Sequence, residues 1–131
     1  HDGSYSASYV PIHSGLDQVT VQVNGSPLTG SPFTITVGTG PAAAATTTAS
    51  VSKIFIGYFQ IDAIVTTRDG QGNLLGRGGE QVSVLVDGSP TPVVDNGNGT
   101  YTMLPVGTFN PSPTVTITLN GVPISGSPFF P

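Results

Sequence analysis

The chain has 131 residues, of which 18 are glycine and 12 are proline, and its formal net charge is -4. Only 8% of the residues are charged, and the three cations, Lys53, Arg68 and Arg77, are scattered. Nucleic-acid binding through phosphates requires a basic cluster. A membrane-spanning helix requires about 20 successive apolar residues. The sequence has neither, so we expect no nucleic-acid partner and no membrane insertion.

The scarcity of ions also bears on location. Such a surface stays soluble through Thr, Ser, Asn and Gly or through attached sugar, which favours an extracellular or cell-surface protein over a cytoplasmic one. The absence of cysteine excludes a disulfide framework and a thiolate metal site. The chain begins at His1 without a signal peptide, and we interpret it as a processed or excerpted segment of a longer protein.

Residues 1–38 repeat the end of a unit that is complete only further along the chain. Three motifs occur twice, each displaced by 96 residues, as from Tyr5 to Tyr101. They are Gly3-Ser4-Tyr5 with Gly99-Thr100-Tyr101, Val19 to Gly25 with Val115 to Gly121, and Gly30-Ser31-Pro32-Phe33 with Gly126-Ser127-Pro128-Phe129. A constant displacement without gaps indicates an internal repeat.

Residues 39–50 are rich in Ala and Thr and show no apolar period, so the sequence predicts a linker there. Its three successive threonines are candidate sites for O-linked glycans: Thr46, Thr47 and Thr48. A bare flexible spacer is the alternative reading.

Residues 51–131 form the complete unit. Apolar residues alternate with polar ones over 59–65 and 82–86, the period of a half-buried strand. Further strands are predicted at 93–94, 100–104, 115–119 and 124–130, with Asp-Gly and Asn-Gly turns between several of them. We therefore predict an all-β protein made of immunoglobulin-like Greek-key β-sandwich repeats.

Several motifs resemble the filamin-type immunoglobulin repeat. They are Arg68-Asp69, Gly72-Asn73, Leu75 and Gly78-Gly79, the run from Asp95 to Tyr101, and the closing Gly126-Ser127-Pro128-Phe129. The Cys…Trp…Cys core of ordinary immunoglobulin domains is absent. The resemblance covers residues 51–131 as a whole repeat and 3–37 as its last three strands, usually lettered E, F and G.

The resemblance implies tandem arrays that act as spacers, force-bearing rods or docking sites. In filamins, partners often add a strand to a groove between strands C and D. That groove would here be lined by four valines: Val84, Val86, Val93 and Val94. Pro90 and Pro92 lie on the expected D strand and remove two backbone donors, a departure from that docking mode. The low charge resembles the surface and adhesion proteins that carry such repeats.

The sequence favours no enzyme and no cofactor. The histidines are His1, which is terminal, and His13, whose counterpart in the complete unit is Phe109, so a base for nucleophilic catalysis is missing from the repeat. Most of the acids adjoin glycines in turns, where Asp serves the backbone. The Asp95–Gly99 run lacks the closing glutamate of a calcium loop.

Two sequons lie in expected hairpin turns: Asn24-Gly25-Ser26 and Asn98-Gly99-Thr100. A glycan at such a turn would project into solvent, which makes Asn98 and Asn24 candidate N-glycosylation sites. Pro27 weakens the first sequon as an acceptor. The alternative is that Asn-Gly followed by Ser or Thr serves the turn alone.

The incomplete unit cannot bury its apolar residues, because strands F and G pair with each other while strand E loses its neighbours. Either preceding strands were left out, or another molecule completes the unit and drives head-to-tail growth. We expect a structural module of an extracellular filament or surface protein, with other copies or neighbouring repeats as partners. The alternatives are an adhesion or ligand-binding module that contacts another surface protein, and a cytosolic filamin-like scaffold.

Overall fold

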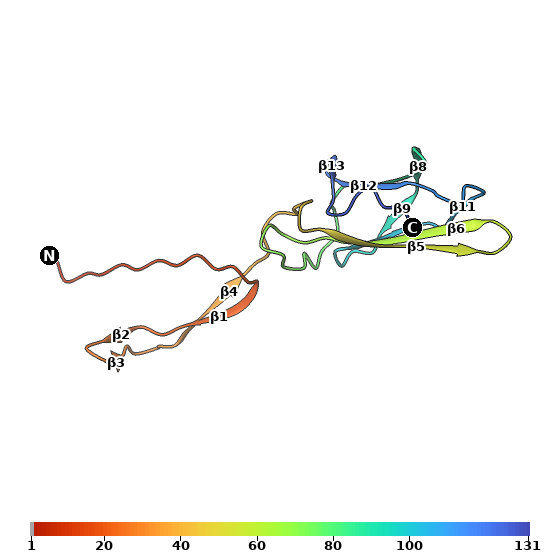
Figure 1. Ribbon diagram of the computed structural model, residues 1–131. Helices are drawn as coiled ribbons and strands as arrows, with labels where there is room; N and C mark the ends of the chain where they lie inside the picture. Colours follow the sequence, from red (N-terminus) through yellow and green to blue (C-terminus); the bar gives the residue numbers. More distant parts are fainter. Residues whose placement is uncertain (1) are drawn as a thin grey trace. The chain divides into compact units, whose positions relative to one another are not determined.

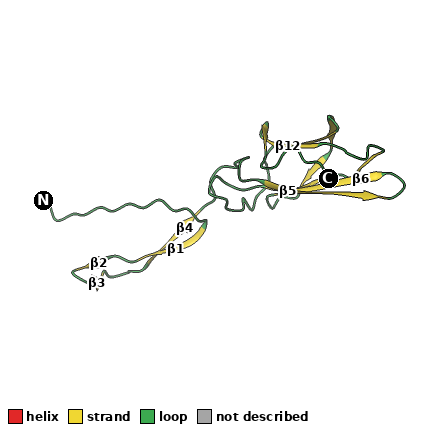
Figure 2. Ribbon diagram, viewed as in Figure 1, coloured by secondary structure: helices red, strands yellow, loops and turns green. Residues whose placement is uncertain are grey.

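The computed structural model describes residues 2–131, which divide into two compact units (Figure 1). Unit 1 ends at Thr39, and unit 2 is Gly40–Pro131. All the regular structure in the described residues is β, and every strand pair is antiparallel (Figure 2). The prediction of an all-β chain is confirmed.

Unit 1 is a long hairpin. Strand β1 (Gly15–Val19) pairs with β4 (Phe33–Val37), from Gly15 opposite Val37 to Val19 opposite Phe33. Beyond them, the short strands β2 (Gln22–Val23) and β3 (Ser26–Pro27) pair across the Asn24-Gly25 turn. Both turn residues have positive φ, as a type I′ turn requires.

Unit 2 contains one sheet built around strand β6 (Phe59–Thr66). On one edge β6 pairs with β5 (Thr48–Phe55) over eight residue pairs. On the other edge it pairs with β10 (Thr100–Met103) and with β11 (Val106–Thr108). Strand β9 (Val93–Asp95) pairs with the free edge of β10.

The second sheet of unit 2 has the order β13-β12-β7-β8. Strand β7 (Val82–Val86) pairs with β12 (Val115–Leu119) along its whole length and with β8 (Ser89–Thr91) on the other side. Strand β13 (Val122–Pro123) closes a hairpin with β12. Strand β8 includes Pro90 and was not expected as a partner of β7 from the sequence.

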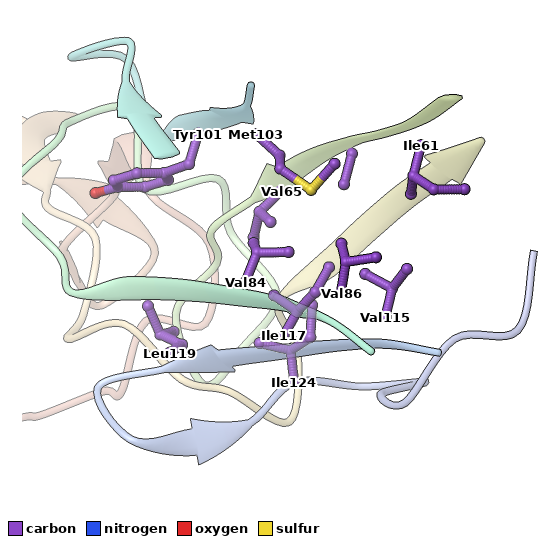
Figure 3. Packing of buried hydrophobic residues seen from close by; sticks show 11 residues of the cluster. Ile61, Val65, Val84, Val86, Tyr101, Met103, Val115, Ile117, Leu119 and Ile124 are labelled. Carbon is purple, nitrogen blue, oxygen red and sulfur yellow. The ribbon is translucent and has the colours of Figure 1, made fainter. Parts of the chain in front are cut away.

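The buried side chains of both sheets meet in one apolar cluster (Figure 3). Each strand contributes alternate residues, because successive side chains of a strand point to opposite faces. The members are Ile61, Ala63, Val65, Val84, Val86, Tyr101, Met103, Val115, Ile117, Leu119 and Ile124. Burying each large member stabilises the fold by about 1.5–3 kcal/mol relative to exposure, so this cluster is the main source of stability in unit 2.

The segment expected as a linker differs from that expectation. From Gly40 onward it belongs to unit 2, and β5 begins within it at Thr48. Ala42 forms a bridge to Asp69, and the amide of Ala43 donates to the carbonyl of Arg68. Non-local hydrogen bonds hold the segment in place, and its Ala42, Ala44 and Ala49 also pack against the core of unit 2.

Candidate functional site

The two copies of the repeated segment, residues 19–33 and 115–129, fold into the same hairpin. Asn24 and Asn120 have φ values of 52° and 51°, and the glycine after each has 82°. The amide of Val21 donates to Ser31 Oγ at 2.8 Å, and its counterpart Ile117 donates to Ser127 Oγ at 2.9 Å. The displacement of 96 residues is therefore also a structural repeat, bond for bond.

The surroundings of the two hairpins differ. In unit 2, strand β7 lies beside β12, and Ile117, Leu119 and Ile124 are at most 3% exposed. Their counterparts in unit 1 are Val21, Val23 and Leu28, which are 38%, 55% and 42% exposed. We call the surface formed by Val21, Val23, Leu28 and Phe33 the bare hairpin face. It has the chemistry of a core but lies open in unit 1.

The segment expected to be strand E of the incomplete unit shows the same contrast. Tyr101 on β10 is buried, and its Oη accepts a hydrogen bond from the amide of Glu80; burial raises its pKa. Its counterpart Tyr5 is 98% exposed, in a segment that forms no strand. Strand β10 is held by β6 and β9, and unit 1 contains no equivalent of either strand in its described residues.

A hollow of about 590 Å³ lies in unit 1, lined in part by Tyr9, Asp17, Val19 and Ile35. Tyr9 Oη donates to Asp17 Oδ2 at 3.1 Å. Val19 is the counterpart of Val115, which is fully buried in unit 2. Part of the hollow's lining is thus equivalent to core residues of the complete unit.

The structure does not present Val84 and Val86 in an open groove. Both side chains are buried in the core, and the two residues are already paired with β12 on one edge and β8 on the other. Val93 is half-buried and Val94 is exposed, on β9 of the other sheet. The groove expected from the four valines differs from the structure because the core takes up the β7 side chains.

The two sequon asparagines are exposed in turns. Asn98 Oδ1 accepts hydrogen bonds from the amide and hydroxyl of Thr100, at 3.0 and 2.7 Å. Asn24 lies at the tip of the β2–β3 hairpin. Both positions leave room for an oligosaccharide in solvent.

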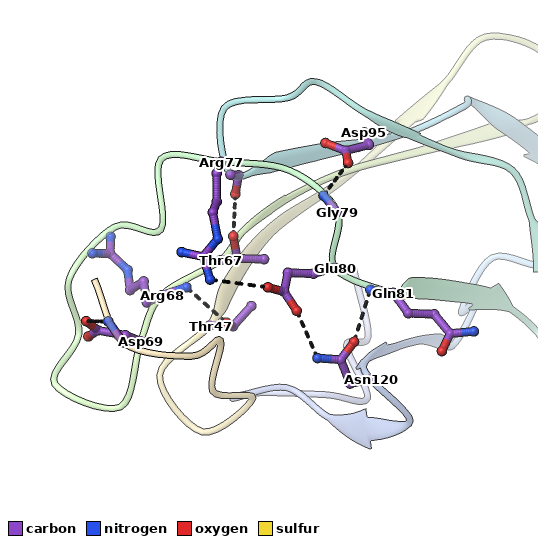
Figure 4. A network of polar contacts seen from close by, with 12 residues as sticks. Thr47, Thr67, Arg68, Asp69, Arg77, Gly79, Glu80, Gln81, Asp95 and Asn120 are labelled. Atoms are coloured by element: carbon purple, nitrogen blue, oxygen red, sulfur yellow. Dashed lines mark hydrogen bonds and ion pairs between the residues drawn. The ribbon is translucent and has the colours of Figure 1, made fainter. Parts of the chain in front are cut away.

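The threonine run offers less access. The Thr47 side chain is fully buried, and its Oγ1 accepts from the amide of Arg68 (Figure 4). Thr46 Oγ1 donates to backbone carbonyls, and Thr48 is exposed. A sugar on Thr47 would have no route to solvent, so Thr48 is the accessible member.

A polar network lies at the end of unit 2 where the chain enters it (Figure 4). The buried Asp69 carboxylate accepts from the amides of Gly40, Gln71 and Asn73 at 2.9–3.0 Å. These bonds, led by that of the Asn73 side chain, lower the pKa of Asp69 to about 2. The carboxylate thus joins the start of unit 2 to the 67–75 loop.

Other acids also bind backbone amides. Asp95 accepts from Gly79 and Gly97, and Asp87 Oδ1 accepts from Thr114. Glu80 accepts from Asn120 Nδ2 and lies 3.8 Å from Arg77 Nη2. These carboxylates fix turns and loops, as the sequence predicted for acids beside glycine.

The two histidines were not expected to act in catalysis. His1 lies outside the described residues, and His13 lies in an exposed stretch of unit 1. Within residues 2–131, no three His, Cys, Asp or Glu side chains come together as a metal site. The same residues include no helix with the length and apolar character needed to span a membrane.

Sequence reasoning missed an aromatic surface at the β5–β6 turn. Phe55 and Phe59 have ring centroids 5.1 Å apart, and Tyr58 meets Phe109 edge to face at 6.5 Å. Phe55 and Phe109 are largely exposed. The signal in the sequence that could have indicated this surface is the apolar run from Ile54 to Phe59. We name this run, together with Phe109, the aromatic tip.

No family model matches the chain, and no curated protein matches its sequence. The class that the fold defines is an all-β protein with several antiparallel sheets.

Proposed function

We propose that this chain is a filamin-like immunoglobulin repeat segment that serves as a non-enzymatic structural module of an extracellular filament or surface protein. Neighbouring repeats or other copies are its partners. The observation that carries the proposal is the hairpin built twice, once covered in a core and once bare. A module that leaves such a surface open is suited to association with further β structure.

The strand order supports the sandwich. In one sheet β5, β6, β10 and β9 follow the order A-B-E-D of an immunoglobulin sandwich, and in the other β7 and β12 follow C-F. Phe129 would then begin strand G, as its counterpart Phe33 begins β4 in unit 1. The bridge between Val115 and Phe129 matches the pairing of Val19 with Phe33.

The use of the charged groups supports a structural role. Asp69, Asp87 and Asp95 each accept backbone amides. Catalysis by paired carboxylates requires groups that face a substrate, whereas these face their own loops. The low charge of the chain and its exposed sequons at Asn24 and Asn98 support an extracellular location.

The aromatic tip favours one second candidate, an adhesion or ligand-binding module of a cell-surface protein. Exposed aromatic residues that contact one another are typical of binding surfaces, and here Phe55 contacts Phe59 while Tyr58 contacts Phe109. In this reading a different surface protein, rather than a further repeat, contacts unit 2.

Electron microscopy of the native full-length protein, with intact-mass measurement, tests the proposal. Modules joined end to end, with a glycan mass on Asn98 or Asn24, are the expected result. Isolated non-periodic particles with both asparagines bare would contradict it. A single different protein bound at the aromatic tip would favour the adhesion module.

A further inference from the structure

We propose that Asn98 is a site of spontaneous covalent modification, at which the residue becomes aspartate or isoaspartate. The Gly99 backbone amide is the nucleophile, ammonia is the leaving group and water is the co-reactant. The site lies in the turn between β9 and β10 of unit 2, and its chemistry is independent of the proposed function.

An asparagine that precedes a glycine can undergo an intramolecular acyl transfer. The glycine nitrogen loses its proton to a base in the solvent and forms a bond to the asparagine Cγ, while an electron pair of the carbonyl moves to Oδ1. The tetrahedral intermediate then expels Nδ2, which takes a proton from water and leaves as ammonia. Water opens the resulting succinimide ring at either carbonyl, which gives aspartate or isoaspartate.

Hydrogen bonds hold the Asn98 side chain close to the Gly99 amide. Its Oδ1 accepts from the Thr100 amide at 3.0 Å and from the Thr100 hydroxyl at 2.7 Å. Because both donors belong to the residue two positions on, the side chain folds back along the main chain, and the ring of atoms that each bond closes includes the Gly99 nitrogen. Holding two reacting groups together in this way raises the rate of their reaction.

The same two bonds stabilise the charge that develops during ring closure. Attack on Cγ places negative charge on Oδ1, and the N–H and O–H groups already directed at that oxygen stabilise this charge as an oxyanion hole does. Asn98 is exposed, so solvent screening makes the effect smaller than in an enclosed site. The same exposure lets water and hydroxide reach the reacting groups.

The nucleophile and the leaving group are both free to react. Within residues 2–131, neither the Gly99 amide nor Asn98 Nδ2 has a hydrogen-bond partner. The Gly99 carbonyl, in contrast, accepts from the Thr67 amide at 2.9 Å and from Thr67 Oγ1 at 2.8 Å. A Cβ on Gly99 would lie 2.8 Å from the Gly76 nitrogen. These contacts fix Gly99 in place and leave its nitrogen unbonded.

Asn96 also precedes a glycine, but its reacting groups are engaged. The Gly97 amide donates to Asp95 Oδ1 at 2.8 Å, so the nucleophile is bound. Asn96 Nδ2 donates to Thr100 Oγ1 at 3.0 Å and to Thr102 Oγ1 at 2.9 Å, which holds the leaving group. Ring closure at Asn96 requires these bonds to break.

Asn120 is the third asparagine of unit 2 that precedes a glycine, and its side chain is held at both ends. Oδ1 accepts from the Gln81 amide at 3.0 Å, and Nδ2 donates to Glu80 Oε2 at 3.0 Å. Both partners lie in the segment before β7, so the Asn120 carboxamide is tied to that segment. Among the three asparagines, the structure therefore favours reaction at Asn98.

Conversion would change the turn in two ways. It adds a charge at position 98 and removes the N-glycosylation acceptor, because a glycan is attached to the nitrogen that leaves. Isoaspartate also carries the main chain through the former side chain, which lengthens the backbone beside Gly99 and disturbs its close approach to Gly76. A molecule converted at Asn98 can no longer accept a glycan there.

The test incubates the full, unglycosylated 131-residue chain in mildly alkaline buffer made with heavy-oxygen water, and peptide mass spectrometry then measures each site. Conversion at Asn98, with heavy oxygen in the product, should be faster than at Asn96 and Asn120 by about tenfold or more. The chain unfolded in urea is the control. There the three asparagines share only the following glycine, so their rates should be similar.

Variants test the role of the Thr100 hydroxyl. Thr100→Val removes that donor and should slow conversion of Asn98 by about three- to tenfold, whereas Thr100→Ser keeps a hydroxyl and should retain the rate. Thr102→Val is the matched control, because each valine variant removes one acceptor of Asn96 Nδ2 but only Thr100→Val removes a donor to Asn98. Thr102→Val should leave the rate at Asn98 unchanged.

Equal conversion of the three asparagines in the folded chain would overturn the inference, as would an unreactive Asn98 beside a reactive Asn96 or Asn120. The same ratio of rates with and without urea would assign the difference to the local sequence rather than the fold, with the same consequence. Equal rates at Asn98 in Thr100→Val and Thr102→Val would show that the Thr100 hydroxyl does not assist ring closure.

Discussion

Asp69 joins segments that the sequence separates. Its carboxylate accepts from Gly40 at the start of unit 2 and from Gln71 and Asn73 in its own loop. Charge-assisted bonds to several amides favour the ionised form, and the pKa of Asp69 is accordingly lowered to about 2. The entry of the chain into unit 2 therefore depends on one ionised side chain.

This dependence predicts how stability changes with pH. Because the folded pKa lies below the ordinary value of 3.8, the contribution of Asp69 is fully present above that value and is lost as pH falls through about 2. The free energy of unfolding, measured with urea, should fall as the pH is lowered from about 5 to about 2. Asp69→Asn should lower the midpoint at neutral pH and flatten this acid dependence.

Asp62→Asn is the matched control, because Asp62 lies on β6 and accepts one bond from the Gln60 side chain. It should leave the neutral-pH midpoint nearly unchanged. Equal losses of stability in the two variants would show that the amide bonds of Asp69 do not stabilise unit 2.

At the scale of elements, the two hairpins separate what the local sequence dictates from what the surroundings supply. The Asn-Gly turn, the serine that caps the Val21 or Ile117 amide and the alternating apolar residues suffice to form the hairpin in both units. Burial requires β7 as well. Equivalent residues should therefore differ greatly in their effect on stability.

We predict that Ile117→Ala destabilises unit 2 by about 2–5 kcal/mol, because it leaves a cavity beneath β7. Val21→Ala should change stability by less than about 0.5 kcal/mol, since its side chain is substantially exposed. Urea unfolding followed by circular dichroism measures both. Comparable losses in the two variants would mean that Val21 is covered in solution.

The hairpins were predictable from the sequence because their signals are local. Asn-Gly turns and the constant displacement need no knowledge of the rest of the chain. The alternation over 59–65 likewise predicted most of β6. These features depend on neighbours only a few residues apart.

The structural features that could not be predicted from the sequence depend on contacts between residues far apart in the chain. Thr47 is buried because it accepts the Arg68 amide, and the Ala-rich segment is fixed by bonds to the 67–75 loop. The burial of Val84 and Val86 depends on two sheets meeting over one core. The sequence placed Pro90 on an expected D strand, whereas the structure has it on β8, which pairs with β7 at the sheet edge, where a missing donor is tolerated.

At the scale of the whole molecule, unit 2 contains a core formed by two sheets, whereas the described residues of unit 1 contain a hairpin without a covering sheet. The 39 residues of unit 1 bury little apolar surface by themselves, so its hairpin is stabilised far less than unit 2. The central claim is therefore that unit 1 is the open counterpart of a covered hairpin in unit 2.

Native-state amide hydrogen exchange tests this claim most directly. The amides of Val21 and Ile117 make the same bond, each to a serine Oγ, so a difference between them reports their surroundings. In the chain alone, Ile117 should exchange only on unfolding of unit 2, and Val21 should exchange faster by orders of magnitude. Equal protection of the two amides would contradict the account.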